Sequence, residues 1–481
     1  MLIDIKLKKE NSIFKIDFLL NQETGELLTL DDLINLSGVI FCSNLDTAFI
    51  YIVKNLIKNG FKNVFQAEKE NHFSFVYKNG ECLSIFIKKK HPLRLMNFEK
   101  KFSQPFRDYN SNLKLLNYAK ANGRVAVSLG RDAFVEWLKS AFLCKGRQLS
   151  IDACLKLFRE DYPIISHPLL DRAKEVVSGF QFSRPGYYEN TFVYDIASSF
   201  PSQLLNATPK GNFKEFENIE SVPKSYFYIV KFVALDIKTK KNKIDFLNID
   251  GKNVETLVLT KHLFELFKSN YYVSRLSVRL ILGFKTSKGK FTRFVEKSAI
   301  GGKELEFDPL IKKYNKAIAN SLTGYFGKNT LRLRTKWLKG SIVESIIKSK
   351  PIYLPVYLFV LGKAKAEFIK TLQQVGFDNI IYANTDGFIS KNKLDLKFLN
   401  LGRTGKIGNF KEKKCFKKLF IECMNGYAGE TTTGEIDNTL SGMKLVSKVS
   451  VEEYKNKNFD YIVKEIAPSG EIVERIIKRG D

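Results

Sequence analysis

The sequence predicts an α+β protein of several subdomains, in which strand-rich segments alternate with amphipathic helices. Its 481 residues are enough for about two to four subdomains. There is no internal repeat and no apolar run of about 18 residues, so we expect a soluble chain without a membrane span. The six cysteines are scattered without a Cys-x-x-Cys pair and the four histidines are dispersed. This pattern argues against a zinc site or a disulfide framework and favours a reducing cytoplasm.

The charge balance predicts a polyanionic partner. Lys and Arg number 78 against 51 Asp and Glu, which gives a net charge of +27. A basic surface of this size most often binds nucleic acid. A lysine-rich proteome from an AT-rich genome is the alternative explanation, so the charge by itself names no reaction.

The expected elements follow from apolar patterning along the chain. "GVIFCSN" (38–44) predicts a buried strand, and "TAFIYIVKNLIKNG" (47–60) predicts an amphipathic helix that ends at Gly60. The remaining expected elements are helices over 130–160, about 309–325 and about 356–374, a strand-rich region over 211–300, and short strands with basic loops such as "KEKKCFKK" (411–418) over 392–481.

Two acids stand at the ends of expected strands. In "VYDIASSFPS" a strand delivers Asp195 ahead of a helix, and in "IIYANTDGFIS" an apolar strand delivers Asp386 to a glycine turn. Carboxylates on adjacent strands can hold two Mg²⁺ ions, which clamp the oxygens of an in-line phosphoryl displacement. Either acid alone is more often a turn cap than a ligand.

The segment "PLIKKYNKAIANSLTGYFGK" (309–328) predicts a helix with two different faces. At about 100° per residue, one face carries apolar and aromatic side chains, namely Ile311, Tyr314, Ile318, Leu322 and Tyr325. The opposite face carries Lys312, Lys316, Asn320 and Thr323. Cations on that face suit a triphosphate, and an ordinary solvated lysine face is the alternative.

Together the three segments resemble motifs A, B and C of family B DNA polymerases, in the same order. The matching patterns are Asp-x-x-Ser-x-Phe-Pro-Ser, Lys-x-x-x-Asn-Ser-x-x-Gly and Tyr-x-Asn-Thr-Asp-Gly. The long intervals between them are most similar to the short phage polymerases that use a protein primer. The resemblance covers residues 170–481.

The resemblance implies a role for each motif residue. Asp195 and Asp386 would bind two metal ions, Mg²⁺ with Mn²⁺ as an alternative, together with the backbone carbonyl of Ile196. Phe200 would lie under the sugar of the incoming nucleotide and exclude a 2′-hydroxyl by its bulk. The other implied contacts are to the nucleotide, from Ser198, Ser199, Lys316 and Asn320, and to DNA, from Lys312, Ser321, Thr323, Gly324 and Tyr427.

Three positions depart from the family pattern. Asn384 stands where the family has the first acid of motif C, Thr323 replaces a motif B tyrosine, and Asn425 replaces the lysine of a Lys-x-Tyr motif. In the family the second acid, here Asp386, is the metal ligand. Because Asn384 can still hydrogen-bond without a charge, we expect this turn to be a working site.

Residues 1–165 resemble, more weakly, an α/β, ribonuclease H-like 3′–5′ exonuclease that has lost acids. Asp4 remains in "LIDIKL", where Lys6 replaces the Glu of an Asp-x-Glu motif. The second motif is two residues short and leaves Asp46, and the third keeps Asp132 with serine in place of its tyrosine. The expected domain guides DNA without proofreading, and an unrelated α/β domain is the alternative.

The fold that the resemblance implies is a right-hand polymerase, with palm, fingers and a small thumb, preceded by this exonuclease-like domain. Its expected segments are the exonuclease-like domain (1–165), palm with motif A and an inserted strand-rich subdomain (166–300), fingers helix with motif B and a following hairpin (301–350), palm with motif C (351–395), and palm end and thumb (396–481).

We therefore expect a DNA-templated DNA polymerase that adds deoxynucleotides to a primer 3′ hydroxyl and replicates a phage or mobile element in the host cytoplasm. Its expected partners are a DNA primer–template, deoxynucleoside triphosphates and, as an alternative primer, a terminal protein; no membrane partner is expected. A polymerase-like protein that binds DNA without synthesis is the alternative from another class. A nuclease is a third, against which the Lys-x-x-x-Asn-Ser helix argues.

Overall fold

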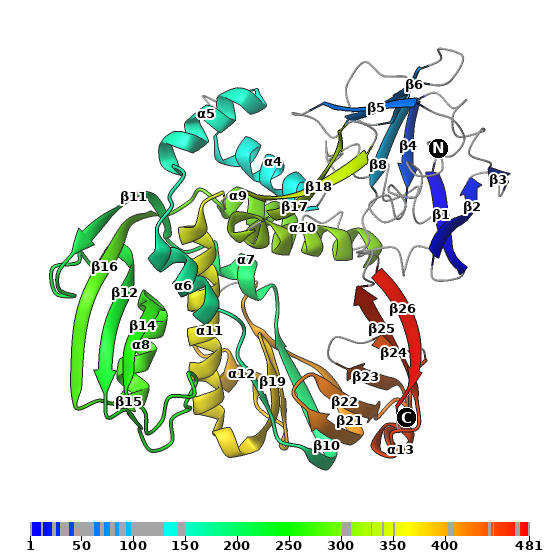
Figure 1. Cartoon of the computed structure of the whole chain (residues 1–481). Helices are drawn as coiled ribbons and strands as arrows, with labels where there is room; N and C mark the ends of the chain where they lie inside the picture. The colour runs from blue at the N-terminus through cyan, green and yellow to red at the C-terminus, as the bar shows by residue number, and fades with distance from the viewer. Residues whose placement is uncertain are drawn as a thin grey trace. The chain divides into compact units, whose positions relative to one another are not determined.

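The computed structural model divides the chain into two compact units, residues 1–137 with 301–351 and residues 138–300 with 352–481. Figure 1 shows the helices and strands of both units. The structure describes residues 2–10, 13–21, 26–28, 38–42, 62–67, 72–76, 82–85, 93–97, 129–142, 150–300, 309–328, 330–338, 341–349, 352–402, 407–440, 444–445, 447–466 and 472–479.

The first unit contains a mixed five-stranded sheet of order β3-β2-β1-β4-β8. β1 pairs antiparallel with β2 and parallel with β4, and β4 runs parallel to β8. The strand expected from "GVIFCSN" is confirmed as β4, and the helix expected over 47–60 lies outside the described residues. The strands of this unit are β1 (Leu2–Glu10), β2 (Ile13–Asn21), β3 (Leu27–Leu28), β4 (Gly38–Cys42), β8 (Leu93–Asn97), a second sheet of β5 (Lys62–Ala67), β6 (His72–Val76) and β7 (Cys82–Ile85), and a hairpin of β17 (Thr330–Leu338) and β18 (Ser341–Ser349).

The expected two-faced helix is α10 (Pro309–Gly327). Its apolar face is buried, with Ile318 and Leu322 fully inaccessible, while Lys312 and Lys316 are exposed. Aromatic rings of α4 (Leu129–Ala141) pack on the end of α10, since the Phe134 and Tyr325 rings lie 5.2 Å apart, as do those of Trp137 and Phe326. Such ring pairs stabilise the contact beyond the area they bury.

Thr323 corrects the predicted face of this helix. It was expected among the polar side chains, yet it is only 2% exposed. Its neighbours Leu322, Phe326 and Gly327 are buried too, so the second half of α10 is covered more widely than the first. The Thr323 hydroxyl has no hydrogen-bond partner among the described residues.

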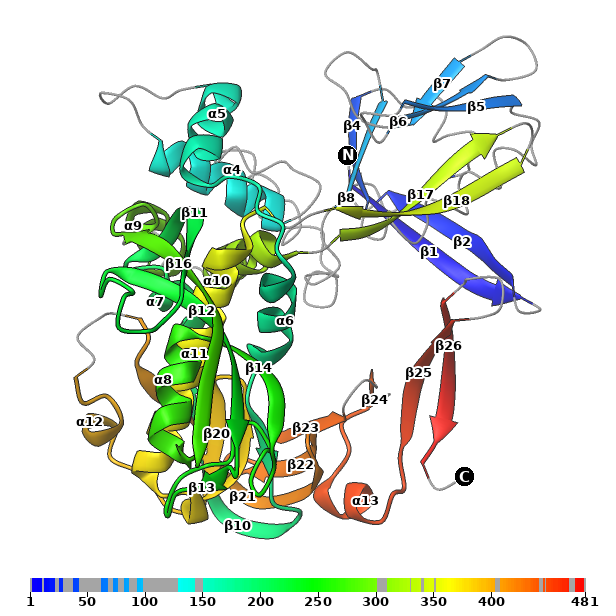
Figure 2. The same cartoon turned by 60° about the vertical axis from the view of Figure 1, so that its left-hand side comes forward.

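The second unit is built around α11 (Leu354–Val375), which is buried on most sides. Pro355 stands in its first turn and Gly376, at φ 88°, ends it, so the sequence defines both of its limits. In Figure 1 and Figure 2 this helix lies between the seven-stranded sheet β23-β22-β21-β10-β20-β19-β9 and the four-stranded sheet β11-β16-β12-β14. No helix in the described part of the chain is long and apolar enough to cross a membrane.

The strands of the second unit confirm most of the expected pattern. Residues 411–418, however, were expected to form a basic loop and lie instead within β21. The strands are β9 (Gln181–Ser183), β10 (Gly186–Ile196), β11 (Thr208–Phe216), β12 (Tyr226–Leu235), β13 (Lys238–Thr239), β14 (Val254–Thr260), β15 (Tyr271–Tyr272), β16 (Arg275–Ser287), β19 (Ile380–Asn384), β20 (Gly387–Ser390), β21 (Phe410–Cys423), β22 (Gly426–Thr431), β23 (Ile436–Leu440), β24 (Lys444–Leu445), β25 (Asp460–Ile466) and β26 (Ile472–Lys478).

Short helices connect these strands. The helices of this unit besides α11 are α5 (Ile151–Asp161), α6 (Pro168–Val176), α7 (Ser199–Gln203), α8 (Lys261–Asn270), α9 (Thr292–Val295), α12 (Leu396–Leu399) and α13 (Val451–Lys455), with short π- and 3₁₀-helical turns at Glu296–Ile300 and Phe377–Asn379.

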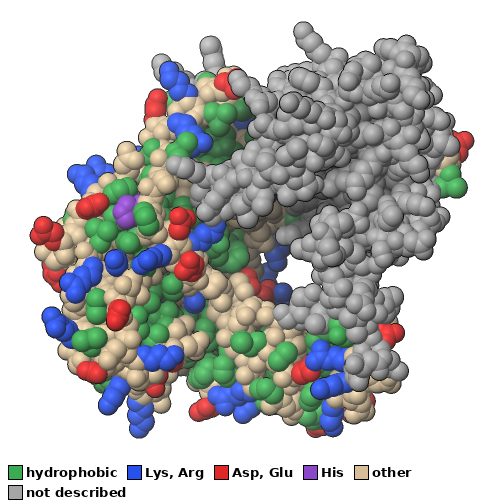
Figure 3. Space-filling view, viewed as in Figure 1, with side chains coloured by type: hydrophobic (Ala, Val, Ile, Leu, Met, Phe, Trp, Pro, Cys, Tyr) green, Lys and Arg blue, Asp and Glu red, His purple; other side chains and the backbone are tan. Residues whose placement is uncertain are grey.

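On the face that Figure 3 shows, the positive charge is spread over the described residues. On the face in Figure 3, Lys and Arg side chains lie among Asp and Glu side chains and do not gather into one patch. The net charge of +27 therefore gives no location for a nucleic-acid contact on this face.

Candidate active site

The structure places Asp195 in β10 and Asp386 in the turn directly before the adjacent strand β20. Asp195 lies near the end of β10 and pairs in register with Gly387 of β20. The Ile196 amide donates to the Asp386 carbonyl over 3.0 Å. A Cβ at residue 387 would lie 3.1 Å from Asp195 Oδ1 and 3.2 Å from the Tyr194 carbonyl oxygen, so a side chain here would require these neighbours to shift by a few tenths of an ångström, whereas glycine lets the strands approach without a shift.

These groups suit a divalent metal, because Mg²⁺ is usually held by one or two carboxylates together with substrate phosphates. No group of three or more His, Cys, Asp or Glu side chains that could hold a metal occurs among the described residues. A cation at this site would therefore rely on Asp195, Asp386 and main-chain oxygen such as that of Ile196. The carboxylate and carbonyl oxygens present are hard donors of the kind that Mg²⁺ prefers.

A lysine that the sequence did not single out contacts the first acid. Lys413 Nζ lies 2.7 Å from Asp195 Oδ2, and the Asp195 side chain is 18% exposed. The pairing of β10 with β21 shifts between Val193 and Tyr194, which face Lys414 and Glu412, so Lys413 is the extra residue of a bulge. Bulges next to active sites redirect side chains in this way. A basic run was visible in the sequence, but its spacing could not reveal the bulge.

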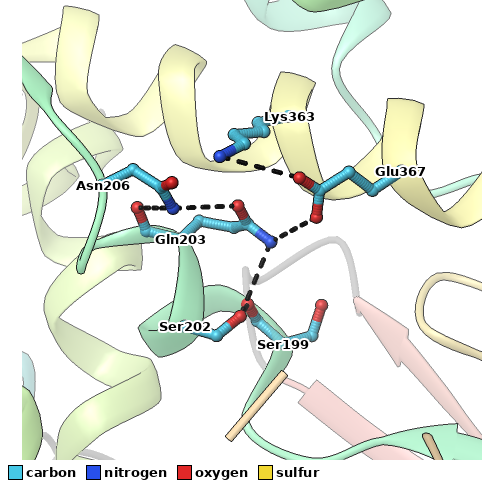
Figure 4. Close-up of polar contacts among 6 residues, drawn as sticks. All are labelled: Ser199, Ser202, Gln203, Asn206, Lys363 and Glu367. Atoms are coloured by element: carbon cyan, nitrogen blue, oxygen red, sulfur yellow. Dashed lines mark hydrogen bonds and ion pairs between the residues drawn. The ribbon is translucent and has the colours of Figure 1, made fainter. Parts of the chain in front are cut away.

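The segment after Asp195 forms α7 and is fixed to α11 by polar contacts, shown in Figure 4. Gln203 Nε2 donates to Glu367 Oε2 over 2.8 Å, and the Ser202 hydroxyl donates to the Ser199 carbonyl over 2.6 Å. Lys363 completes the network through Glu367 at 3.6 Å. Burial lowers the pKa of Lys363, and Glu367 opposes that shift.

The other predicted residues of motif A lie on this short helix or directly before it. Ser198 and Ser199 are buried and Phe200 is half-buried. Ser198 precedes α7 at φ 53°, so the chain enters the helix through a left-handed residue. The contacts of α7 with α11 therefore hold the predicted nucleotide-side segment in place.

The predicted motif B residues belong to α10, in the first unit, whereas Asp195 and Asp386 belong to the second. Lys312, Lys316 and Gly324 are exposed and Asn320 and Ser321 are half-buried. A Cβ added at Gly324 would meet nothing within 4 Å. Apart from Thr323, these residues are thus available on the helix surface.

The Tyr427 side chain is fixed by a hydrogen bond and by ring packing. Its hydroxyl donates to Asp437 Oδ2 over 2.9 Å and its ring packs edge-on against Tyr382, with centroids 5.4 Å apart. Burial first, and the Asp437 carboxylate next, raise the pKa of Tyr427 above its ordinary range. The ring is therefore a neutral, fixed surface beside the motif C strand.

The structure describes little around the acids of the predicted exonuclease-like motifs. Asp4 lies in β1 and Asp132 in α4, both without a described side chain, and Asp46 lies outside the described residues. Their predicted roles stay predictions.

The fold and the paired acids resemble those of type B DNA polymerases. Residues 158–387, which contain the segments that resemble motifs A, B and C, match the model of the family "DNA polymerase type B, organellar and viral". This match confirms the resemblance found from the motifs.

Two of the proteins with similar sequences are DNA polymerases of phages. The DNA polymerases of Bacillus phages phi29 and PZA are each 22% identical over 312 residues, covering 59% of this chain and 54% of the relative. The match thus spans about half the length of these relatives. The structure of phi29 DNA polymerase complexed with primer-template DNA is similar with a TM-score of 0.74 at 17% identity, covering 99% of both chains, and that of phi29 DNA polymerase complexed with single-stranded DNA has a TM-score of 0.70 at 16% identity, covering 100% of both.

Proposed function

We propose that this chain is a DNA-templated DNA polymerase that extends a primer 3′ hydroxyl. The observation that carries the proposal is the pairing of Asp195 with Gly387, because Gly387 directly follows Asp386 in the chain. Two such carboxylates, in a chain that matches type B polymerases, suit the transfer of a nucleotidyl group better than any other chemistry considered.

Each motif residue then has a definite task. Asp195, Asp386 and the Ile196 carbonyl hold the metal ions, two Mg²⁺ with Mn²⁺ as an alternative, which neutralise charge on the triphosphate when bound. Lys316 binds the triphosphate, Asn320, Ser198 and Ser199 contact the nucleotide, and the Phe200 ring lies under the sugar. The primer hydroxyl attacks the α-phosphate and pyrophosphate leaves, so the protein contributes positioning and electrostatic stabilisation.

The proposed architecture is a right hand. The seven-stranded sheet with β10, β19 and β20 serves as palm, α10 as fingers, and the end of the chain as a small thumb. The order β3-β2-β1-β4-β8, with β2 antiparallel to the parallel strands β1, β4 and β8, supports an exonuclease-like, ribonuclease H-like domain in the first unit.

The proposed partners are a DNA primer–template and deoxynucleoside triphosphates. Lys312, Ser321, Gly324 and Tyr427 would contact DNA; Thr323 was predicted among them, but its side chain is buried. A terminal protein is the proposed alternative primer, because the motifs and their spacing resemble those of the short phage polymerases that use a protein primer. The host cytoplasm of a phage or mobile element is the proposed location.

Primer extension with the purified chain, Mg²⁺ and four deoxynucleotides tests this function. Wild type should extend, and Asp195→Asn or Asp386→Asn should abolish synthesis. DNA affinity should change little in both variants, because lysine–phosphate contacts dominate such binding. A wild-type chain that binds primer–template but never extends it, with or without a terminal protein, would instead support the DNA-binding alternative.

A further inference from the structure

Two of the three departures from the family pattern meet in the folded protein. Asn384 Nδ2 donates to Asn425 Oδ1 over 2.6 Å, although the residues are 41 positions apart. We name these two residues the amide pair. Asn384 ends β19, and Asn425 lies in the turn between β21 and β22.

The turn that follows Asn384 is strained. Thr385 has φ 61°, a left-handed conformation that is an outlier for a β-branched residue. Its amide donates to the Phe180 carbonyl over 2.8 Å, and its hydroxyl donates to Asn384 Oδ1 over 3.0 Å. A Cβ at Gly179 would lie 2.4 Å from that hydroxyl, so the threonine fits only against a glycine. Strain of this kind persists where the surroundings fix the conformation.

The main chain of Asp386 is hydrogen-bonded to Asn384. The Asp386 amide donates to the Asn384 carbonyl over 2.7 Å. The Asn384 side chain is thus bonded to Asn425 and Thr385, and its main chain is bonded to the metal-binding acid. A displacement of the amide pair would therefore also displace the main chain of Asp386.

The backbone conformation at position 425 favours asparagine. It has φ 61°, which asparagine tolerates far better than a long side chain does. The Tyr382 hydroxyl donates to the same Asn425 Oδ1 over 3.4 Å, and Tyr382 packs on Tyr427. The position of the amide pair is therefore fixed by residues of strand β19 and by the turn between β21 and β22.

We infer that Asn384 and Asn425 act as one uncharged unit that positions Asp386. Asn384 stands where the family pattern has an acid and Asn425 where it has a lysine, and these two replacements then form a single matched change. This inference rests on the proposed function. The amide pair needs one donor and one acceptor facing each other. An asparagine can exchange the two by rotating its amide, whereas two carboxylates offer no donor.

Isosteric variants test the pair. Asn384→Asp and Asn425→Asp should each stay within about threefold of the wild-type incorporation rate, because the remaining amide can donate to the new carboxylate. The double variant should fall at least about tenfold below the product of the single effects, as expected for groups in direct contact. Its loss should appear in the rate constant, with nucleotide KM and primer–template affinity little changed. Asn384→Asp combined with Asn425→Lys should recover part of the lost rate, since a donor is restored although a long side chain then stands at φ 61°.

Mn²⁺ binding to the protein without DNA, followed by electron paramagnetic resonance, gives a readout independent of synthesis. Each added carboxylate attracts Mn²⁺ by its charge, so the double variant should bind Mn²⁺ more weakly than the product of the two single-variant changes in affinity predicts. A matched control lies at the other end of the same hairpin, where Asn392 Nδ2 donates to Asn379 Oδ1 over 3.2 Å at the surface. Asn379→Asp with Asn392→Asp should show additive, small effects. Additive effects at residues 384 and 425 in an active enzyme would overturn the inference, whereas an inactive wild type would overturn the proposed function alone.

Discussion

Asp195 forms an ion pair with a lysine of another strand. The Lys413 ammonium lies 2.7 Å from its carboxylate, while the neighbouring Lys414 pairs with Asp437. An ammonium at this position occupies a carboxylate oxygen that a metal ion would need. The half-exposed lysine side chain, at 53%, can leave that oxygen without disturbing the core.

Lys413→Ala is therefore expected to tighten metal binding. Without the competing ammonium, the protein free of DNA and nucleotide should bind Mn²⁺ roughly threefold to tenfold more tightly, by the Coulomb energy of a partly solvated pair. Titration calorimetry or electron paramagnetic resonance measures this. Lys417→Ala, which removes an exposed lysine of the same strand, is the control. Weaker binding in Lys413→Ala would show that the lysine supports the metal site.

Phe200 gives a second prediction for a single side chain. The half-buried ring lies on α7, directly after the strand that carries Asp195. Phe200→Val should raise ribonucleotide incorporation far more than it lowers deoxynucleotide incorporation, because the bulk that excludes the 2′-hydroxyl is lost. The ratio of the two incorporation efficiencies on one template measures it, and an unchanged ratio would remove Phe200 from this role.

Among the elements, α10 carries the predicted triphosphate contact. Lys316→Ala should raise nucleotide KM or lower the incorporation rate by roughly tenfold to a hundredfold, the scale of about 1.5–3 kcal/mol for a hydrogen bond to a charged group. Primer–template affinity should stay nearly constant. Lys312→Ala, one turn earlier on the exposed face, should weaken DNA binding instead. If Lys316→Ala chiefly loses DNA affinity, its face contacts DNA and not the nucleotide.

Elements whose signals are local could be predicted from the sequence. The strand ending at Asp195, the helix limited by Pro355 and Gly376, and the apolar face of α10 all depend on residues within a few turns of one another. The bulge at Lys413, the burial of Thr323 and the amide pair depend on segments far apart in the chain. Spacing within one segment carries no information about which distant strand or helix packs against it.

For the whole molecule, the five-stranded sheet of the first unit has the strand order proposed for an exonuclease-like domain, while Lys6 replaces the Glu of the Asp-x-Glu motif in its first strand. A sheet can persist without catalytic residues because strand pairing depends on the backbone and on apolar faces. The expected result is a domain that retains a DNA-guiding role beside an active polymerase.

The chain is accordingly expected not to proofread. Two-metal hydrolysis needs several carboxylates on one phosphate. The first motif offers Asp4 beside Lys6, whose charge repels a metal ion, and the third offers Asp132 with Ser128 in place of tyrosine. The purified protein with Mg²⁺ should extend a matched primer and leave a mismatched 3′ end intact when nucleotides are withheld. Stepwise removal of 3′ nucleotides that disappears in Asp4→Ala or Asp132→Ala, while extension survives, would show instead that the first unit is a working nuclease.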